Sequence, residues 1–222
     1  MKKLMFSGVA LAGVLLAGEA GAARAPSDLD ILKAYAADFA GDASLTAPVE
    51  FGVRVGDVFY TVNAKPGAAT ARKGAPKAPT FFFTVENSAF LNRVYAGELN
   101  ALTAMAKAFS SDAAPMDIDA MEGFQPADDF GDWVIPFTFH FWTRGNPETV
   151  AFGPEMTRVT HGANLGVFYY QPGLRSAWFD IRPGQHVNEN ENSRDNPFPS
   201  MVIMIRGEAT AIIGGEISTL KE

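Results

Sequence analysis

The sequence predicts an α+β first half followed by an all-β second half, and two observations support this division. In the first half, between residues 27 and 126, segments with apolar residues at helical spacing occur beside segments in which every second residue is apolar. In the second half, from residue 130 to 222, short apolar runs are separated by turns rich in Gly and Pro, without strong helical periodicity. We therefore expect the second half to be a sandwich or a partial barrel, with a domain boundary near residue 128.

The first half is predicted to contain three helices and a sheet. Ser27 is a suitable N-cap for the first helix, and Gly97 is a suitable end for the second. Alternating apolar residues on both sides of Gly56-Asp57 indicate a β-hairpin. The predicted helices span residues 26–42, 87–97 and 98–110. The predicted strands span residues 51–55, 58–62, 80–87 and 114–126, with a short edge strand within 65–79.

The second half is predicted to consist of strands and turns that follow residues 127–133, which are expected to be a linker or an exposed acidic turn. The strands are expected within 133–142, 148–153, 165–171, 176–184 and 200–216. The sequence "IIGGE" near residue 214 is predicted to be a hairpin turn and not a phosphate-binding loop.

The first residues of the chain have the organisation of a secretory signal peptide. Lys2 and Lys3 precede an apolar run at 4–17, and Ala20-Gly21-Ala22 places small residues at the −3 and −1 positions. We expect residues 1–22 to be cleaved off after Ala22 and the protein to be periplasmic or secreted. The apolar run is shorter than the about 20 residues that a transmembrane helix needs. The alternative is an uncleaved membrane anchor. No integral membrane segment is expected in the mature chain.

Composition and charge narrow the classes of partner. The chain has 222 residues, of which 47% are hydrophobic and 19% are charged, as is typical of a globular protein. The absence of cysteine excludes disulfides and thiolate chemistry, so stability must come from the core. The net charge of −7, without a basic run beyond Lys3, argues against nucleic acid as a partner.

The segment "TFFFTVENSAFLNRVYAGELNALTAMAKAF", residues 80–109, carries a resemblance to a known family. A strand leads into a Glu-x-Ser-x-Phe helix start, a Gly97–Asn100 joint follows, and a helix rich in small residues comes next. Over residues 28–125 the chain resembles the sterol carrier protein 2 (SCP2) family of lipid-binding domains. The resemblance implies an α+β domain in which helices cover a mostly antiparallel sheet. It also implies that fatty acyl chains, sterols or other lipids bind in an apolar tunnel between sheet and helices.

If this resemblance holds, eight apolar residues are expected to line the tunnel. They are Phe81, Phe83, Phe90, Leu91, Tyr95, Leu102, Met105 and Phe109. Phe81 and Phe83 share one face of their strand, and Phe82 faces the other side. None of the eight is a catalytic residue type. Composition alone favours ordinary core packing for these side chains, so a tunnel and a filled core are both open alternatives.

Residues 150–222 have a weaker resemblance to one half of a cupin. A strand leads to Pro183-Gly184, a polar loop follows, and "IRGEATAIIGGE" has the form of the subsequent hairpin. The positions that match the family's metal ligands hold Asn190, Asn192 and Ser200, which are not expected ligands of a transition metal. We therefore expect no metal and no cofactor. The alternative is a facial metal site formed by His186, Glu189 and Glu191.

These patterns predict an exported, non-catalytic protein that binds an apolar molecule such as a fatty acid, a sterol or another lipid. One alternative is a cupin-type metalloenzyme, or a cupin that binds a sugar or another small molecule, with an accessory SCP2-like domain. A second alternative is a structural or interaction protein without a ligand. Nucleophile-elbow, Walker and dinucleotide-binding motifs are absent. An aromatic binding face in the second half is also conceivable, from Trp133, Trp142, Trp178, Tyr169, Tyr170 and Arg175.

Overall fold

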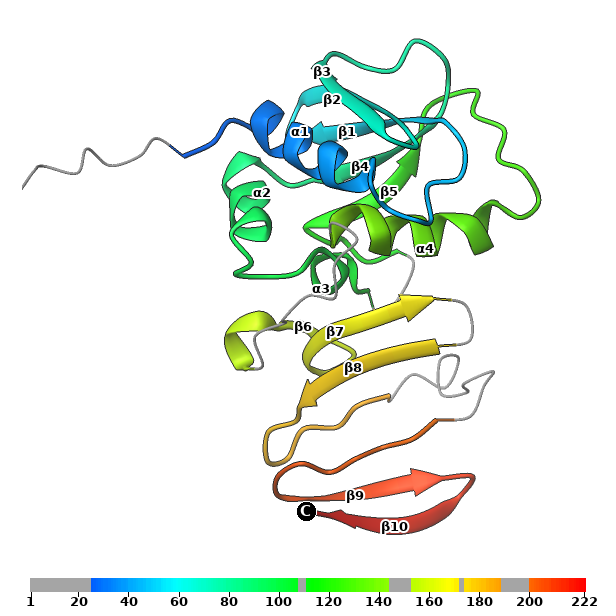
Figure 1. Ribbon diagram of the computed structural model, residues 1–222. Coiled ribbons are helices and arrows are strands. Elements are labelled where there is room, and N and C mark those ends of the chain that lie inside the picture. Colours follow the sequence, from blue (N-terminus) through cyan, green and yellow to red (C-terminus); the bar gives the residue numbers. More distant parts are fainter. Residues whose placement is uncertain (1–24, 108–110, 144–152, 172–173, 189–199) are drawn as a thin grey trace, which may run out of the picture.

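The computed structural model describes residues 25–107, 111–143, 153–171, 174–188 and 200–222, and these form a mixed α+β structure (Figure 1). The predicted signal peptide at residues 1–22 lies outside the described residues. A five-stranded mixed sheet with helices is followed by small antiparallel sheets, and no closed barrel is present in the described ranges. None of the helices in these ranges has the length and apolar character needed to cross a membrane.

The first sheet has the strand order β3-β2-β1-β4-β5. Neighbouring strands are antiparallel except for β1 and β4, which run parallel. The predicted hairpin is present, and Gly56 takes the positive φ of 55° that its tight turn requires. The strands are β1 (Val49–Val55), β2 (Val58–Lys65), β3 (Ala68–Lys73), β4 (Phe81–Val85) and β5 (Met116–Ala120).

Three helices of the first half begin at side-chain caps. Ser27 caps α1 (Asp28–Phe39), Asn87 caps α2 (Ser88–Tyr95) and Asn100 caps α3 (Ala101–Met105), in each case by accepting a hydrogen bond from a backbone N–H in the first turn. Gly97 follows α2 with a φ of 77°, as its predicted role at the helix end requires. The helix α3 has five residues and is shorter than the predicted segment 98–110, whose residues 108–110 lie outside the described ranges.

The strand predicted at residues 133–142 is wrong, because this segment forms a helix, α4 (Phe130–Trp142). Its β-branched and aromatic residues favour a strand locally. Packing overrides that preference, since the buried side chains recur at helical spacing and face the first sheet. They are Val134, Phe137, Thr138, Phe141 and Trp142. The predicted boundary near residue 128 precedes this helix, and the core that α4 shares with the first sheet continues to Trp142.

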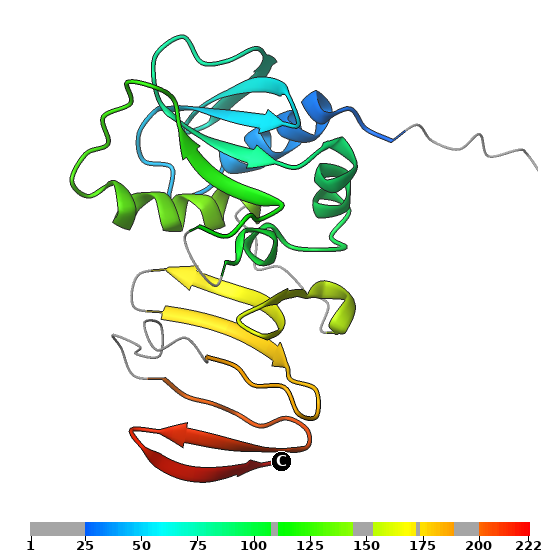
Figure 2. The ribbon, with the colours of Figure 1, turned by 180° about the vertical axis from the view of Figure 1, so that it is seen from behind.

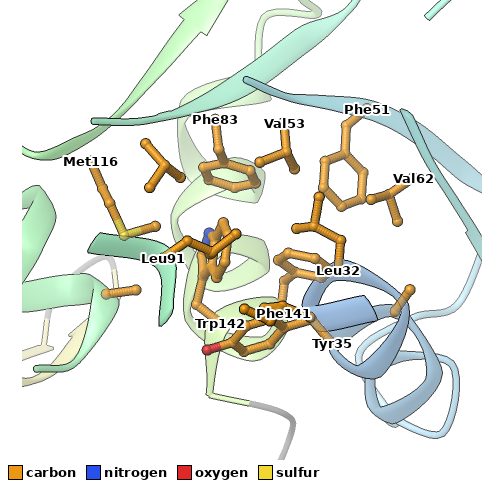
Figure 3. Packing of buried hydrophobic residues seen from close by; sticks show 14 of the residues in the cluster. Leu32, Tyr35, Phe51, Val53, Val62, Phe83, Leu91, Met116, Phe141 and Trp142 are labelled. Carbon is orange, nitrogen blue, oxygen red and sulfur yellow. The ribbon is translucent and has the colours of Figure 1, made fainter. Parts of the chain in front are cut away.

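The main core lies between one face of the first sheet and the helices α1, α2 and α4 (Figure 3). Phe51, Val53 and Phe83 extend from the sheet toward these helices and are fully buried. On the opposite face, Phe82 packs edge-on against Phe59 at a ring distance of 5.2 Å. Gly52 lies beside Phe82 on that face, where an added Cβ would come within 2.7 Å of the Phe82 Cβ.

The strands of the second half form two small antiparallel sheets, which continue away from the first sheet (Figure 2). One sheet has the order β6-β7-β8 and the other is the hairpin of β9 and β10. The predicted turn of that hairpin is confirmed, with positive φ at Gly214 and Gly215. A short 3-10 helix, η1 (Pro154–Met156), precedes the strands of these two sheets. The strands are β6 (Arg158–Thr160), β7 (Ala163–Gln171), β8 (Leu174–Asp180), β9 (Glu208–Ile213) and β10 (Glu216–Lys221).

Candidate functional site

The candidate site is the layer of aromatic rings between the first sheet and α4. Phe83, on β4, is stacked with Phe137 and Phe141 at ring distances of 6.3 Å and 6.2 Å. It also meets the ring of Trp142 edge-on at 5.4 Å. Phe51 on β1 contacts the same two α4 phenylalanines at 5.0 Å and 4.9 Å. The space on this face of the sheet is therefore occupied by side chains of α4.

The aromatic layer reaches the surface at the beginning of α4. Phe81 contacts Phe130 at a ring distance of 5.5 Å and Trp133 at 5.6 Å. Trp133 is stacked on Phe137 at 4.8 Å, yet 42% of its surface is exposed. Trp133 therefore connects the buried aromatic layer with the solvent-exposed surface.

The other predicted ligand residues lie on α2 and α3. Phe90 and Leu91 are buried members of the core, and Tyr95 is half-buried, with its ring 5.8 Å from that of Tyr35. Met105 packs against the core from α3. The structure thus brings Phe81, Phe83, Phe90 and Leu91 into one core, with Tyr95 and Met105 at its border. Leu102 is buried but is not among the members of this core, and Phe109 lies outside the described residues.

Trp142 contributes an unpaired polar atom to the layer. Its indole Nε1 is buried and has no hydrogen-bond partner among the described residues. The side chain is 2% exposed and packs against Tyr35 at a ring distance of 5.0 Å. Figure 3 shows the nitrogen on the side of the ring nearest Phe83. Leaving such a donor unpaired costs about 1–3 kcal/mol, so it requires a specific explanation.

The helix α4 is held in place by its packing more than by its own sequence. Pro136 lies in its interior, where the missing N–H removes one helical hydrogen bond. Asp129, the N-cap residue, makes no side-chain capping hydrogen bond. The remaining residues are mostly aromatic or β-branched, which lowers intrinsic helix stability. The cover of the aromatic layer is therefore an element with a weak preference for the helical state.

One polar contact attaches α4 to the loop after α1. The Nδ1 atom of His140 lies 3.0 Å from an Oδ2 of Asp42, whose side chain is 4% exposed. Burial acts to raise the pKa of the Asp42 carboxyl, but hydrogen bonds from Ser44 and His140 outweigh burial and hold that pKa below its ordinary value. Asp42 is therefore charged at neutral pH and fixes the last turn of α4.

The Gly97–Asn100 joint connects the first half to β7. Asn100 accepts a hydrogen bond from the Thr103 backbone N–H at 2.7 Å and donates one from Nδ2 to the Val167 carbonyl, also at 2.7 Å. The fully buried Thr103 hydroxyl accepts from the Val167 N–H at 2.8 Å. Arg158, on β6, donates to the last carbonyls of α3, at Thr103, Ala104 and Ala106. Side chains thus replace backbone pairing at this edge of β7.

The alternative metal site receives no support from the described residues. His186 is exposed, whereas Glu189 and Glu191 lie outside the described ranges. No group of three or more His, Asp or Glu side chains suited to a metal ion occurs within those ranges. The residues of the proposed aromatic face come from three elements: Trp133 and Trp142 from α4, Tyr169 and Tyr170 from β7, and Arg175 and Trp178 from β8.

Comparisons with protein-family models, with curated proteins and with solved structures find no match for this chain. The SCP2-like and cupin-like resemblances therefore stay predictions. Sequence reasoning missed Phe51, Phe137, Phe141 and the indole of Trp142 as parts of the layer. The sequence signal that could have identified the α4 residues is the helical spacing of apolar residues between positions 134 and 142.

Proposed function

We propose that this protein binds an apolar molecule between the first sheet and α4 and does not catalyse a reaction on it. The observation that carries the proposal is the cover itself: Phe81 and Phe83, two of the predicted ligand residues, lie beneath a helix of low intrinsic stability. The layer is made of aromatic rings, which favour flat or flexible apolar ligands. In this function α4 occupies the binding surface when the ligand is absent and moves outward when the ligand enters.

The route of entry in this proposal is the solvent-exposed end of the layer at Trp133. A ligand displaces the contacts between α4 and the sheet, and its own apolar surface replaces them. Binding therefore competes with closure of α4, and the apparent affinity depends on how stable the closed helix is. Exported carriers of lipids or related apolar molecules fit this behaviour, in agreement with the predicted signal peptide.

A substitution in α4 tests this competition directly. Protein freed of bound lipid is titrated with the methyl ester of cis-parinaric acid, a fluorescent apolar chain, and saturable binding is expected. Pro136→Ala restores a helical hydrogen bond, so the variant should melt at a higher temperature and bind the probe about tenfold more weakly, which corresponds to roughly 1.4 kcal/mol of added closure. Pro48→Ala, outside α4, serves as the matched control and should leave binding unchanged. Absence of saturable binding by the wild type would refute the proposal.

A second candidate function, self-association, is favoured by the apolar surface of the second half. Among the large apolar side chains that are exposed in the described residues, only Trp133, on α4, precedes residue 159. Ile212 and Ile217 are cross-strand partners on one face of the β9–β10 hairpin and are 72% and 75% exposed. The others are Val159, Leu174, Phe179, Ile181, Met201, Val202, Ile203, Ile205 and Ile213. An isolated two-stranded hairpin with such faces is marginal in water without a partner.

The proposed partner of this surface is a second copy of the chain. Seven large apolar side chains between residues 201 and 217 are 58–84% exposed. A second copy that covered them would bury them at the centre of an interface, and a standard interface buries about 800 Å² on each partner. Charges there nearly cancel, because this segment contains Arg206 and Lys221 together with Glu208, Glu216 and Glu222, and Lys221 pairs with Glu208. Identical copies therefore repel each other weakly. Micromolar dimerisation is expected.

Analytical ultracentrifugation between 1 and 100 μM tests this second candidate. The wild type should dimerise, and Ile217→Lys should remain monomeric because it places a charge within the contact. Ser218→Lys adds the same charge on the opposite face of β10 and is the control. A wild type that stays monomeric at 100 μM would exclude a second copy as the partner.

A further inference from the structure

We infer that the molecule bound beneath α4 carries an uncharged oxygen acceptor, such as a hydroxyl, ester or ketone group, which accepts a hydrogen bond from Nε1 of Trp142. This inference rests on the proposed function and names the chemical class of its ligand. It starts from the unpaired indole N–H, which is buried in the layer and directed toward the sheet (Figure 3). A ligand between α4 and Phe83 would lie on the side of the indole from which this N–H extends.

The surroundings of Trp142 show why this donor is exceptional. Its ring contacts Tyr35, Phe83 and Phe141 at distances of 5.0, 5.4 and 4.9 Å, and all three partners are apolar at the contact. Buried hydroxyl groups of the same unit are satisfied: Thr138 donates to the Val134 carbonyl and Thr61 to the Gly74 carbonyl. A phenylalanine in place of Trp142 would avoid the unpaired donor, so the N–H has a use that the closed structure does not supply.

Among the described residues, no Lys or Arg belongs to the core that contains the indole, and this composition favours an uncharged acceptor. Among the described residues up to 143, the ion pairs lie at the border of the core, in His140–Asp42 and Lys107–Asp117, or on the surface, in Arg93–Glu98. The core members that surround the indole are apolar. One indole N–H does not compensate for the desolvation of a carboxylate, whereas it satisfies one lone pair of a hydroxyl or carbonyl oxygen. Long-chain alcohols, sterols and esters are therefore favoured over free fatty acids.

Competition between matched C16 compounds tests this preference. Hexadecanol and methyl palmitate should each displace the fluorescent methyl ester about tenfold more strongly than hexadecane, as expected for one buried hydrogen bond, and palmitate should compete less well than hexadecanol. In Trp142→Phe the advantage of hexadecanol over hexadecane should disappear while hexadecane still binds. Trp178→Phe, on β8, is the matched control and should keep the advantage.

A second measurement uses the unaltered protein and does not depend on folding of the variants. The chain has three tryptophans, so ¹⁵N-labelled protein gives three indole N–H signals. The chemical shift of one indole N–H should move downfield when hexadecanol binds. Hexadecane should not cause this downfield shift. If hexadecane competes as well as hexadecanol and no indole signal responds to the oxygen, the inference is wrong and the proposed function stands. If neither compound nor the fluorescent ester binds, the proposed function itself fails.

Discussion

Replacing Asn100 by Ala removes two hydrogen bonds that serve different parts of the molecule. The side-chain oxygen caps α3 through the Thr103 N–H at 2.7 Å, and the side-chain nitrogen donates to the Val167 carbonyl at 2.7 Å. Loss of an N-cap costs about 1 kcal/mol, and loss of a hydrogen bond to a half-buried carbonyl costs about 1 kcal/mol more. We therefore expect Asn100→Ala to lower the free energy of unfolding by about 2 kcal/mol.

Two further variants separate the contributions. Asn100→Asp keeps the capping oxygen and replaces the donor with an acceptor, so about 1 kcal/mol or more should be lost through Val167 alone. Asn87→Ala removes the cap of α2, which accepts from the Phe90 N–H at 2.9 Å, and should cost about 1 kcal/mol without any effect on β7.

Urea unfolding followed by tryptophan fluorescence measures these differences, and hydrogen exchange locates them. Amides in peptides that cover β7 should exchange faster in both Asn100 variants and at the wild-type rate in Asn87→Ala. The reasoning is refuted if Asn100→Asp is as stable as the wild type, or if Asn100→Ala costs no more than Asn87→Ala. Either result would mean that the contact with Val167 adds nothing to the attachment of the second half.

Three other changes have expected outcomes. Gly52→Ala should lower the free energy of unfolding by about 1–3 kcal/mol and the melting temperature by several degrees, because the new methyl group meets Phe82. Gly131→Ala has open space and lies in α4, so it should not lower the stability. Asp42→Asn should be less stable than the wild type at pH 7. Urea titrations should show that this difference in stability disappears as the pH falls below about 4. The reason is that a carboxyl whose pKa is lowered by folding stabilises the fold only while it is ionised. Arg158→Met should cost about 2–4 kcal/mol in urea, since the last carbonyls of α3 lose their donor; an unchanged midpoint would contradict that role.

Much of the first half was predictable because its signals are local. The caps at Ser27 and Asn87, the end of α2 at Gly97 and the turn at Gly56 each depend on a few neighbouring residues. Alternation of apolar residues likewise gives the strands of the first hairpin directly. The order of the strands in the sheet was not given by these signals, because the parallel pairing of β1 with β4 joins segments that are distant in the sequence.

The error at α4 has a physical cause. Its residues satisfy the composition of a buried strand and the spacing of a helix at the same time, and Pro136 weakens the helical interpretation further. Only the presence of an apolar sheet face opposite the helix decides between the two. Short apolar runs are ambiguous in this way because side-chain chemistry alone does not reveal what they will pack against.

The candidate site was predictable in part. Phe81 and Phe83 share a strand face, as period-2 alternation requires, and both belong to the core. Their partners on α4 come from a segment about 50 residues further along the chain. The unpaired nitrogen of Trp142 depends on three-dimensional packing. The link between Asn100 and Val167 also spans 67 positions and leaves no local trace in the sequence.

The late position of α4 in the chain affects how the protein is made. Synthesis proceeds from the N-terminus, so all five strands of the first sheet are complete at Ala120, before α4 has emerged. Until Trp142 follows, the rings of Phe51 and Phe83 lack their contacts with α4, and only α1 and α2 cover this face. A fragment that stops at residue 126 should therefore aggregate where one that stops at residue 143 folds. An apolar molecule present during this interval meets an open surface. Refolding in its presence should therefore load more protein than adding it to the finished fold.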